Sequence, residues 1–343
     1  MQSSDINRRL VLASRPEGAP TTDNFRLEHA PVVKPEVGEV LLRTVFLSLD
    51  PYMRGRMSDA KSYAEPVSLG ETMVGGTVSR VVESRLDGFE EGDWILGYSG
   101  WQDYAISDGT GLINLGKNPD YPSFSLGVLG MPGITAYFGL LEIGEPKEGE
   151  TLVVAAATGP VGATVGQIGK LQGCRVIGVA GGEEKCRYAV EELGFDLCLD
   201  HRAEDFTEQL AAACPEGIDI YFESVGGKVF DAVQPLLNDF ARIPVCGLIS
   251  QYNATSLPQG PDRTSLLMRD VLTKRLKIQG FIIFDYYECF HEAVRTLSQW
   301  VAEGSIKYLE DMVEGLEETP NAFIGLLEGK NFGKLVVRIG NDD

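Results

Sequence analysis

The sequence predicts a two-domain α/β protein, in which a doubly wound parallel sheet is accompanied by a small β-barrel. The chain has 343 residues, which is longer than a chain that usually folds around a single hydrophobic core. Its residues up to about 128 form short apolar runs separated by glycine-containing turns, a pattern typical of a small barrel. From Thr151 onward, apolar strand runs alternate with helical patterns, which is typical of a parallel sheet with helices on both faces.

The β-rich region contains four apolar runs that we expect to be strands. They cover residues 38–47, 75–82, 94–98 and 102–106. Turn signals between them, such as Asp87-Gly88, support this division. The apolar pattern of residues 334–339 predicts a further strand, so we expect the tail after about residue 309 to return to this domain. The predicted barrel domain is therefore discontinuous and comprises residues 1–128 with 309–343.

A helix that begins near Gly130 connects the two regions, and we place the second domain, residues 129–308, after this boundary. The helices of this domain show apolar residues at helical spacing. Its six expected strands lie at residues 151–156, 175–180, 197–199, 218–222, 241–246 and 277–284. The helix faces are Phe206, Leu210 and Ala213; Phe230, Val233 and Leu237; and Phe290, Val294, Leu297 and Val301.

The segment from Thr151 to Lys185 predicts a dinucleotide-binding strand–turn–helix–strand unit. An apolar strand leads into a turn of small residues and then into a helix with apolar positions at i, i+4 and i+7. Gly159 lacks a Cβ where the backbone must approach a diphosphate, and Gly162 lets the first helical turn pack against the strand. The N–H groups at the start of the helix would then face the phosphate.

Two residues near these glycines, Pro160 and Ala157, bear on the interpretation of the segment as a dinucleotide-binding turn. Pro160 suits the first helical turn, where its missing N–H costs little. Ala157 stands where the usual fingerprint has its first glycine. A tight turn in some other α/β protein is the alternative interpretation of this segment.

The end of the second strand of this unit favours NADP(H) as the cofactor. An NAD site requires an acidic residue near that strand end to bind the ribose hydroxyls. Here the strand ends in Gly181-Gly182, and Glu183 and Glu184 follow slightly late, on the next helix. Lys185 comes next and could reach a 2′-phosphate as a point charge. A solvated lysine on the helix surface is the alternative.

The net charge and the pattern of cysteines limit which partners and which cellular compartment we expect for this protein. The chain has 30 basic and 50 acidic residues and a net charge of −20, which repels nucleic acid and anionic membranes. Residues 1–24 contain no apolar signal-peptide core, and no run approaches the roughly 20 apolar residues that span a bilayer. The six cysteines lie in the second half without CxxC spacing, which indicates free thiols in a cytoplasmic protein.

The sequence offers no metal site. The first 173 residues contain no cysteine and only one histidine, His29, while His201 and His291 are isolated. A catalytic zinc needs three protein ligands, so a metal-dependent alcohol dehydrogenase is disfavoured. Hydride addition to an activated C=C bond is easier without a metal, because a few hydrogen bonds can stabilise the charge on the remote oxygen. No GxSxG motif supports hydrolysis.

Several motifs, in order along nearly the whole chain, resemble one family. It is the zinc-free branch of the medium-chain dehydrogenase/reductases, which includes prostaglandin and leukotriene reductases, plant alkenal double-bond reductases and bacterial curcumin reductase. The most specific motifs are Asp50-Pro51-Tyr52-Met53-Arg54 and Ser250-Gln251-Tyr252-Asn253. The others are residues 130–139, residues 156–162, Ser224-Val225-Gly226-Gly227 and Asn331-Phe332-Gly333-Lys334.

The resemblance implies a Rossmann domain, a GroES-like barrel domain and an NADPH-dependent reductase of enones or enals, commonly a dimer. Hydride would go to the β-carbon and a proton to the α-carbon. Tyr252 would lie near the substrate carbonyl and donate a hydrogen bond or relay the proton, and Tyr52 would line the substrate cleft. A residue that only positions the ribose is the alternative for Tyr252, and an ordinary packed aromatic is the alternative for Tyr52.

The resemblance also implies a set of cofactor contacts. These are Met131, Thr135, Thr158, Gly159, Pro160, Val161, Gly162, Gly182, Lys185, His201, Ser224, Cys246, Ser250, Tyr252, Phe281, Ile282, Ile283 and Asn331. Met131 and Thr135 would flank the nicotinamide, with packing at the domain hinge as the alternative, and Asn331 would hydrogen-bond the cofactor. His201 or Arg202 stands where relatives often have a tyrosine for the 2′-phosphate, and Ser224 stands where they often have asparagine.

Three functions remain open at this stage. The first is an NADPH-dependent enone reductase, and the second is a quinone reductase on the same scaffold, since both need a flat apolar cleft. The third is an NADP(H)-binding structural or regulatory protein without turnover. NADPH oxidation with an enone, with a quinone and with neither distinguishes them.

Overall fold

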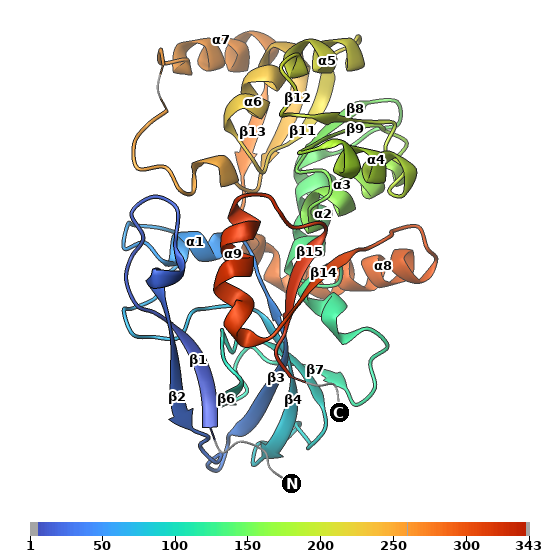
Figure 1. Cartoon of the computed structure of the whole chain (residues 1–343). Helices are drawn as coiled ribbons and strands as arrows, with labels where there is room; N and C mark the ends of the chain where they lie inside the picture. The colour runs from blue at the N-terminus through green and yellow to red at the C-terminus, as the bar shows by residue number, and fades with distance from the viewer. Residues whose placement is uncertain (1–5, 259, 341–343) are drawn as a thin grey trace. The chain divides into compact units, whose positions relative to one another are not determined.

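A computed structural model describes residues 6–258 and 260–340 (Figure 1). The chain forms two compact units. Unit 1 contains the described residues up to Gly127, Glu310–Asn331 and the residues from Leu335 on. Unit 2 contains Val128–Leu309 and Phe332–Lys334. Each unit is described by itself below.

Unit 1 is built around the long central strand β3, Val40–Ser48, which is buried along almost its whole length. It pairs antiparallel with β4, with β6 through its first half and with β15 through its last residues. The seven strands of this sheet are β3, β4 (Thr77–Ser84), β5 (Trp94–Gly97), β6 (Tyr104–Ser107), β7 (Ile113–Gly116), β14 (Glu310–Glu314) and β15 (Lys334–Arg338). The tail of the chain therefore returns to the β-rich part, as its apolar pattern predicts.

A second, two-stranded sheet pairs β1, Ile6–Leu12, with β2, Phe25–Pro31. Its Phe25 stacks on Trp101 at a centroid distance of 5.3 Å, and Phe323 from helix α9 meets the Trp101 ring edge-on at 5.6 Å. These rings are buried together, so the first and last parts of the chain share one core. The helices of unit 1 are α1 (Tyr52–Arg56), α9 (Thr319–Leu327) and the 3₁₀ turns η1 (Thr22–Asn24), η2 (Pro122–Leu126) and η7 (Leu316–Glu318).

Unit 2 contains a six-stranded parallel sheet in the order β10-β9-β8-β11-β12-β13. In chain order this is 3-2-1-4-5-6, the doubly wound arrangement, with its switch point between β8 and β11. The predicted Rossmann-type fold is confirmed. The strands are β8 (Thr151–Ala155), β9 (Arg175–Ala180), β10 (Leu197–Asp200), β11 (Ile218–Phe222), β12 (Leu237–Val245) and β13 (Lys277–Gly280).

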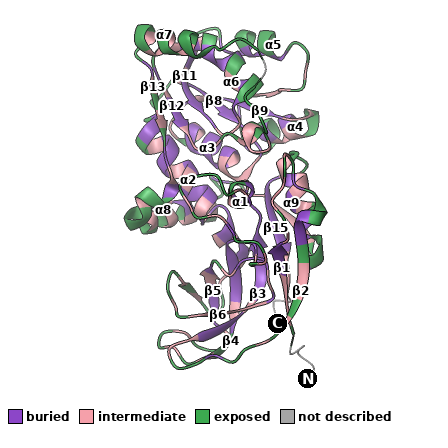
Figure 2. Ribbon diagram, turned by 90° about the vertical axis from the view of Figure 1, so that its left-hand side faces the viewer, coloured by how far each residue is buried: buried purple, intermediate pink, exposed green. Residues whose placement is uncertain are grey.

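Helices cover the sheet, and Figure 2 shows buried central strands beneath helices whose outer faces are exposed. Phe206, Leu210 and Ala213 are buried on one face of α5, as their spacing predicts. The helices are α2 (Met131–Phe138), α3 (Pro160–Leu171), α4 (Glu183–Glu191), α5 (Phe206–Ala213), α6 (Gly227–Val233), α7 (Thr264–Lys274), α8 (Phe290–Ala302), η3 (Gly139–Gly144), η4 (Gln234–Leu236), η5 (Ile249–Gln251) and η6 (Ile283–Cys289). None of the helices in the described part of the chain is long and apolar enough to cross a bilayer.

Several predicted elements differ from the structure at their boundaries, and two of these differences have a clear cause. Leu237, expected on the face of a helix with Val233, is the first residue of β12, because α6 ends at Val233 and Pro235 follows in a short 3₁₀ turn. The strand expected at 277–284 ends at Gly280, whose partner Val245 is the last residue of β12. Beyond that point β13 has no strand to pair with, and Ile283 begins a 3₁₀ helix instead.

Candidate cofactor and catalytic site

The turn between β8 and α3 forms the base of the site. Ala156 directly follows the strand and adopts a φ of 49°, a left-handed conformation that is uncommon for a residue with a side chain. The Gly159 N–H donates to the Ala156 carbonyl at 2.9 Å and the Ala157 N–H to the Val179 carbonyl of β9 at 3.0 Å. The turn is therefore closed by one internal hydrogen bond and fixed to β9 by another before the helix begins.

The glycines of this turn leave room for a ligand at the start of α3. A Cβ on Gly162 would stand 2.3 Å from the Ala156 carbonyl oxygen, so a side chain there would push the helix off the turn. A Cβ on Gly159 would meet only that same oxygen, at 3.3 Å, and no other group. The first N–H groups of a helix have no partner inside it, and Pro160 has none to offer. Val161 and Gly162 thus present N–H groups at a helix end suited to an anion, so the turn fits a diphosphate.

Two further strands, β11 and β12, end at the same edge of the sheet. The Ser224 hydroxyl, just after β11, donates to the Ala155 carbonyl at 3.3 Å, across the switch point. Cys246 follows β12, and its N–H donates to the Glu223 carbonyl at 2.9 Å. Burial raises the pKa of Cys246 to about 12, which keeps the thiol protonated. The structure places the glycine turn, Ser224 and Cys246 at the carboxyl edge of the sheet, where ligands of doubly wound sheets bind.

The segment after Cys246 carries the predicted tyrosine. Tyr252 directly follows η5, and the Leu248 N–H donates to its hydroxyl oxygen at 3.4 Å. A Cβ on Gly247 would lie 3.0 Å from that oxygen, so the missing side chain lets the phenol fold back over the segment. The Ser250 N–H donates to the Val225 carbonyl at 3.0 Å. Ser250 and Tyr252 are therefore held beside the loop that follows β11.

Helix α2 and the residues after β13 pack together in unit 2. Met131 lies against a buried cluster that contains Ile134, Phe138 and Ile283. The Thr135 hydroxyl donates to the Met131 carbonyl at 2.7 Å. Phe281 is buried, and Ile282 is half-buried. Met131 therefore has packing partners within unit 2, and this packing does not exclude the cofactor contacts expected from these residues.

The ends of β9 and β10 carry the residues that we expect near a 2′-phosphate. The Asp200 carboxylate accepts the Arg202 N–H at 2.9 Å and also that of Gly182, and these bonds lower its pKa although burial opposes them. Two backbone N–H groups therefore already occupy part of the hydrogen-bond acceptor capacity of the Asp200 carboxylate. Burial, and then the charge of Arg202, lowers the pKa of His201. Lys185 lies in the first turn of α4, directly after Gly182.

Two predicted residues belong to unit 1. Tyr52 is the first residue of α1, which follows β3, so it lies near a strand end as expected. Burial, and then the charge of Asp50, raises the pKa of Tyr52 above its ordinary value, which keeps the phenol protonated. The Ser48 hydroxyl donates to the Asp50 carboxylate. Asn331 ends the segment of unit 1 that precedes Phe332.

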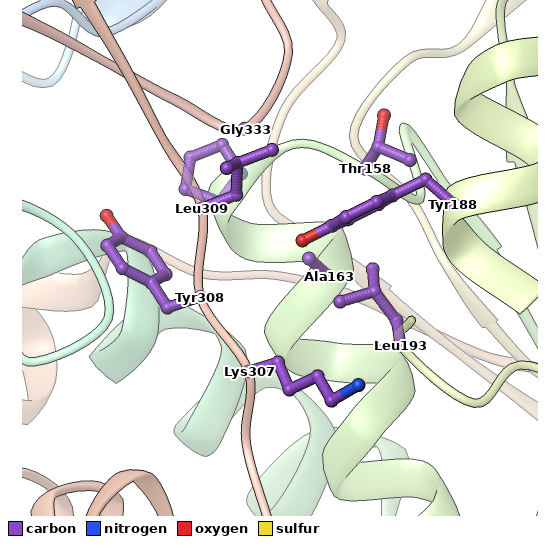
Figure 3. A pocket seen from close by; sticks show the side chains of 9 residues that line it. Thr158, Ala163, Tyr188, Leu193, Lys307, Tyr308, Leu309 and Gly333 are labelled. Carbon is purple, nitrogen blue, oxygen red and sulfur yellow. The ribbon is translucent and has the colours of Figure 1, made fainter. Parts of the chain in front are cut away.

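A small pocket beside the glycine turn contains residues that the sequence did not single out, together with Thr158 and Pro160 (Figure 3). Gln167 of α3 holds Lys307 there, donating to its carbonyl at 3.0 Å and accepting its N–H at 2.7 Å. The two residues are 140 positions apart, so no local pattern signals the contact. The pocket is lined by Thr158, Pro160, Ala163, Tyr188, Leu193, Lys307, Tyr308, Leu309 and Gly333.

The doubly wound sheet, the glycine turn at its switch point and the separate antiparallel unit define a two-domain dinucleotide-binding oxidoreductase. Within residues 6–258 and 260–340, no group of three or more His, Cys, Asp or Glu side chains is arranged to hold a metal ion. Two family models match the chain, "N-terminal domain of oxidoreductase" at residues 8–115 and "Zinc-binding dehydrogenase" at residues 160–301.

Individual relatives match over nearly the full length. NADPH-dependent curcumin reductase of Escherichia coli is 68% identical over 343 residues, 100% of this chain and 99% of that protein. Prostaglandin reductase 1 of Mus musculus is 43% identical over 328 residues, 94% of this chain and 96% of that protein. The crystal structure of CurA from Vibrio vulnificus in complex with NADPH superposes with a TM-score of 0.95 at 66% identity, covering 97% and 99% of the two chains. The chain belongs to the zinc-independent branch of the medium-chain dehydrogenase/reductase family.

Proposed function

We propose that this protein uses NADPH to reduce the activated C=C bond of α,β-unsaturated ketones and aldehydes, without a metal. Hydride is added to the β-carbon and a proton to the α-carbon. The observation that carries the proposal is the full-length similarity to reductases named for NADPH and for curcumin, which is itself an enone. The glycine turn at the switch point, which fits a diphosphate, supports the cofactor assignment.

When bound, NADPH supplies the hydride, and the chain supplies its binding groups. The N–H groups of Val161 and Gly162 take the diphosphate, with Thr158 and Gly159 beside it. Lys185, together with His201 or Arg202, takes the 2′-phosphate near Gly182. The nicotinamide half is held by Met131, Thr135, Ser224, Cys246, Ser250, Tyr252, Phe281, Ile282, Ile283 and Asn331.

Two tyrosines act on the substrate. Tyr252 donates its phenolic proton in a hydrogen bond to the carbonyl oxygen, where negative charge develops as the β-carbon is reduced. A phenol is suited to this because its ordinary pKa of about 10 keeps it protonated at neutral pH. Tyr52 contacts the substrate with a phenol that burial also keeps neutral.

The remaining proposals concern the oligomeric state, the cellular compartment and the partners of the protein. A homodimer is supported by apolar side chains exposed along the β12–β13 edge of the parallel sheet, with Phe240 61% and Ile278 40% exposed. The six free cysteines favour a cytoplasmic protein. The net charge of −20 argues against nucleic acid and anionic membranes as partners.

The test is NADPH oxidation with a panel of enones and enals of different bulk, with a quinone, and with no acceptor. Saturated product from at least one enone, with faster turnover than with the quinone, supports the proposal. Preferred reduction of the quinone would move the assignment to quinone reductase. NADPH binding without oxidation by any acceptor would indicate a non-catalytic protein.

A further inference from the structure

We propose that Glu223 is a positioning residue, whose carboxylate fixes the loop after β11 and, through it, the segment that carries Ser250 and Tyr252. This inference rests on the proposed role of Tyr252. Glu223 immediately follows β11 and is only 2% exposed. Its backbone extends the sheet, because its N–H donates to the Pro244 carbonyl at 2.9 Å and its carbonyl accepts the Cys246 N–H at 2.9 Å.

The side chain of Glu223 turns back onto its own loop. Its Oε1 atom accepts the N–H of Val225 at 2.7 Å and that of Gly226 at 2.8 Å. Gly226 has a φ of 74° and Gly227 a φ of 57°, so the loop folds sharply at this point. One oxygen atom therefore holds two successive N–H groups of a tight turn at the carboxyl edge of the sheet.

The carbonyl groups of the same turn hold the next segment. The Ser224 carbonyl accepts the Ile249 N–H at 3.1 Å, and the Val225 carbonyl accepts the Ser250 N–H at 3.0 Å. The Tyr252 N–H in turn donates to the Ile249 carbonyl at 3.2 Å. A peptide plane is rigid, so a carboxylate that fixes the N–H of one residue also sets the direction of the preceding carbonyl. Glu223 thus acts on Tyr252 through two layers of backbone hydrogen bonds.

The second carboxyl oxygen has a different environment. Neither Glu223 Oε2 nor the Tyr221 hydroxyl has a partner within ordinary hydrogen-bond geometry among the described residues, and both are buried. Burial, and then the nearby Glu223 carboxyl, nevertheless raises the pKa of the Tyr221 phenol. Since Oε1 accepts both the Val225 and the Gly226 N–H, a glutamine that keeps this oxygen should preserve the positioning, whereas an alanine should not.

Asp219 provides a matched control at the opposite end of β11. Its Oδ2 atom accepts the Thr151 N–H at 2.9 Å, and its Oδ1 atom accepts Nδ2 of Asn238 at 2.8 Å. Asp219→Ala therefore also removes a carboxylate that holds a backbone N–H of this sheet, but at the amino end of the strand, away from the loop.

The first experiment is amide hydrogen exchange on the full chain without cofactor. Glu223→Ala should speed exchange at Val225, Gly226 and Ser250 by about tenfold, and Glu223→Gln should restore it. Asp219→Ala should leave these three amides unchanged. Unchanged exchange in Glu223→Ala, or acceleration that glutamine fails to rescue, would overturn the proposal. If the alanine variant does not fold, Glu223→Asp, one methylene too short, is held to the same criteria.

The second experiment is a double-mutant cycle on enone reduction. Glu223→Ala should lower kcat about tenfold in the wild-type background but less than about twofold in Tyr252→Phe, because its effect passes through the phenol. Equal losses in both backgrounds would overturn the link to Tyr252. A wild-type enzyme that reduces no enone would refute the proposed function instead, and the exchange measurement would still decide whether Glu223 positions the segment.

Discussion

The guanidinium group of Arg202 lies against the backbone of Gly181, where a Cβ would stand 3.1 Å from its Cζ, Nε and Nη2 atoms. The two residues come from loops that follow neighbouring parallel strands, β10 and β9. The absence of a side chain at Gly181 therefore makes room for the Arg202 guanidinium group. It lets a permanent cation lie at the position where an NAD-specific protein has an acidic residue.

Arg202→Ala should weaken NADPH binding about tenfold and leave NADH binding nearly unchanged, because one charge-assisted hydrogen bond to the 2′-phosphate is lost. The measurement is the dissociation constant of each cofactor by fluorescence titration. His201→Gln is the companion variant, since either residue could replace the tyrosine of relatives. A larger loss in His201→Gln than in Arg202→Ala would assign the contact to the histidine.

Lys185→Ala should also shift cofactor preference, through the same phosphate. We expect the ratio of kcat/KM for NADPH over NADH to fall about tenfold, as expected for loss of one ionic partner of a phosphate. An unchanged ratio would show that Lys185 is only a lysine of the α4 surface. Lys170 of α3, which pairs with Asp196 at 2.7 Å, is a suitable control for loss of a helix lysine from unit 2.

The doubly wound parallel sheet and the glycine turn could be predicted because both follow from local patterns: apolar runs of strand length that alternate with helices, and small residues between a strand and a helix. The role of Glu223 could not, because its partners lie within the next three residues but its effect reaches Tyr252 through contacts that exist only in the folded chain. The contact between Gln167 and Lys307 spans 140 residues and has no sequence signal. Strand ends such as Gly280 were missed because they depend on where the partner strand stops.

Gly162→Ala should abolish tight cofactor binding. The added methyl group would stand 2.3 Å from the Ala156 carbonyl oxygen and 2.9 Å from its carbon, both backbone atoms that cannot move independently. The start of α3 must therefore shift away from the turn, and we expect at least a tenfold higher dissociation constant for NADPH and a lower Tm. Gly325→Ala on α9 is the control, because its Cβ would meet only the Lys330 side chain at 3.7 Å. Equal NADPH affinity in the two variants would contradict the proposed diphosphate site.

The pH dependence of stability offers a test of the Glu223 environment. Burial raises the pKa of its carboxyl above the ordinary value, so the folded protein binds this proton more tightly than the unfolded chain does. The resulting stabilisation is fully present below the unfolded pKa of about 4.5 and is lost as the pH rises through the folded pKa. Glu223→Gln removes this dependence, so its Tm relative to wild type should be higher at pH 8 than at pH 5. A pH-independent difference in Tm would show that the carboxyl pKa is not raised.

Tyr252→Phe separates donation by the phenol from simple positioning of the cofactor. If the hydroxyl donates to the developing enolate oxygen, kcat for enone reduction should fall about 10- to 100-fold, and the NADPH dissociation constant should change little. If the hydroxyl only contacts the ribose, the dissociation constant should rise while kcat at saturation is preserved. The aromatic ring remains in the variant, and the bond that the hydroxyl accepts from the Leu248 N–H is long, at 3.4 Å, so folding should be retained. Enones with weaker carbonyl polarisation should lose more activity than enals, because they depend more on the donor. Turnover and NADPH affinity that both match the wild type would remove Tyr252 from either role and, with it, the reason for Glu223 to hold this segment.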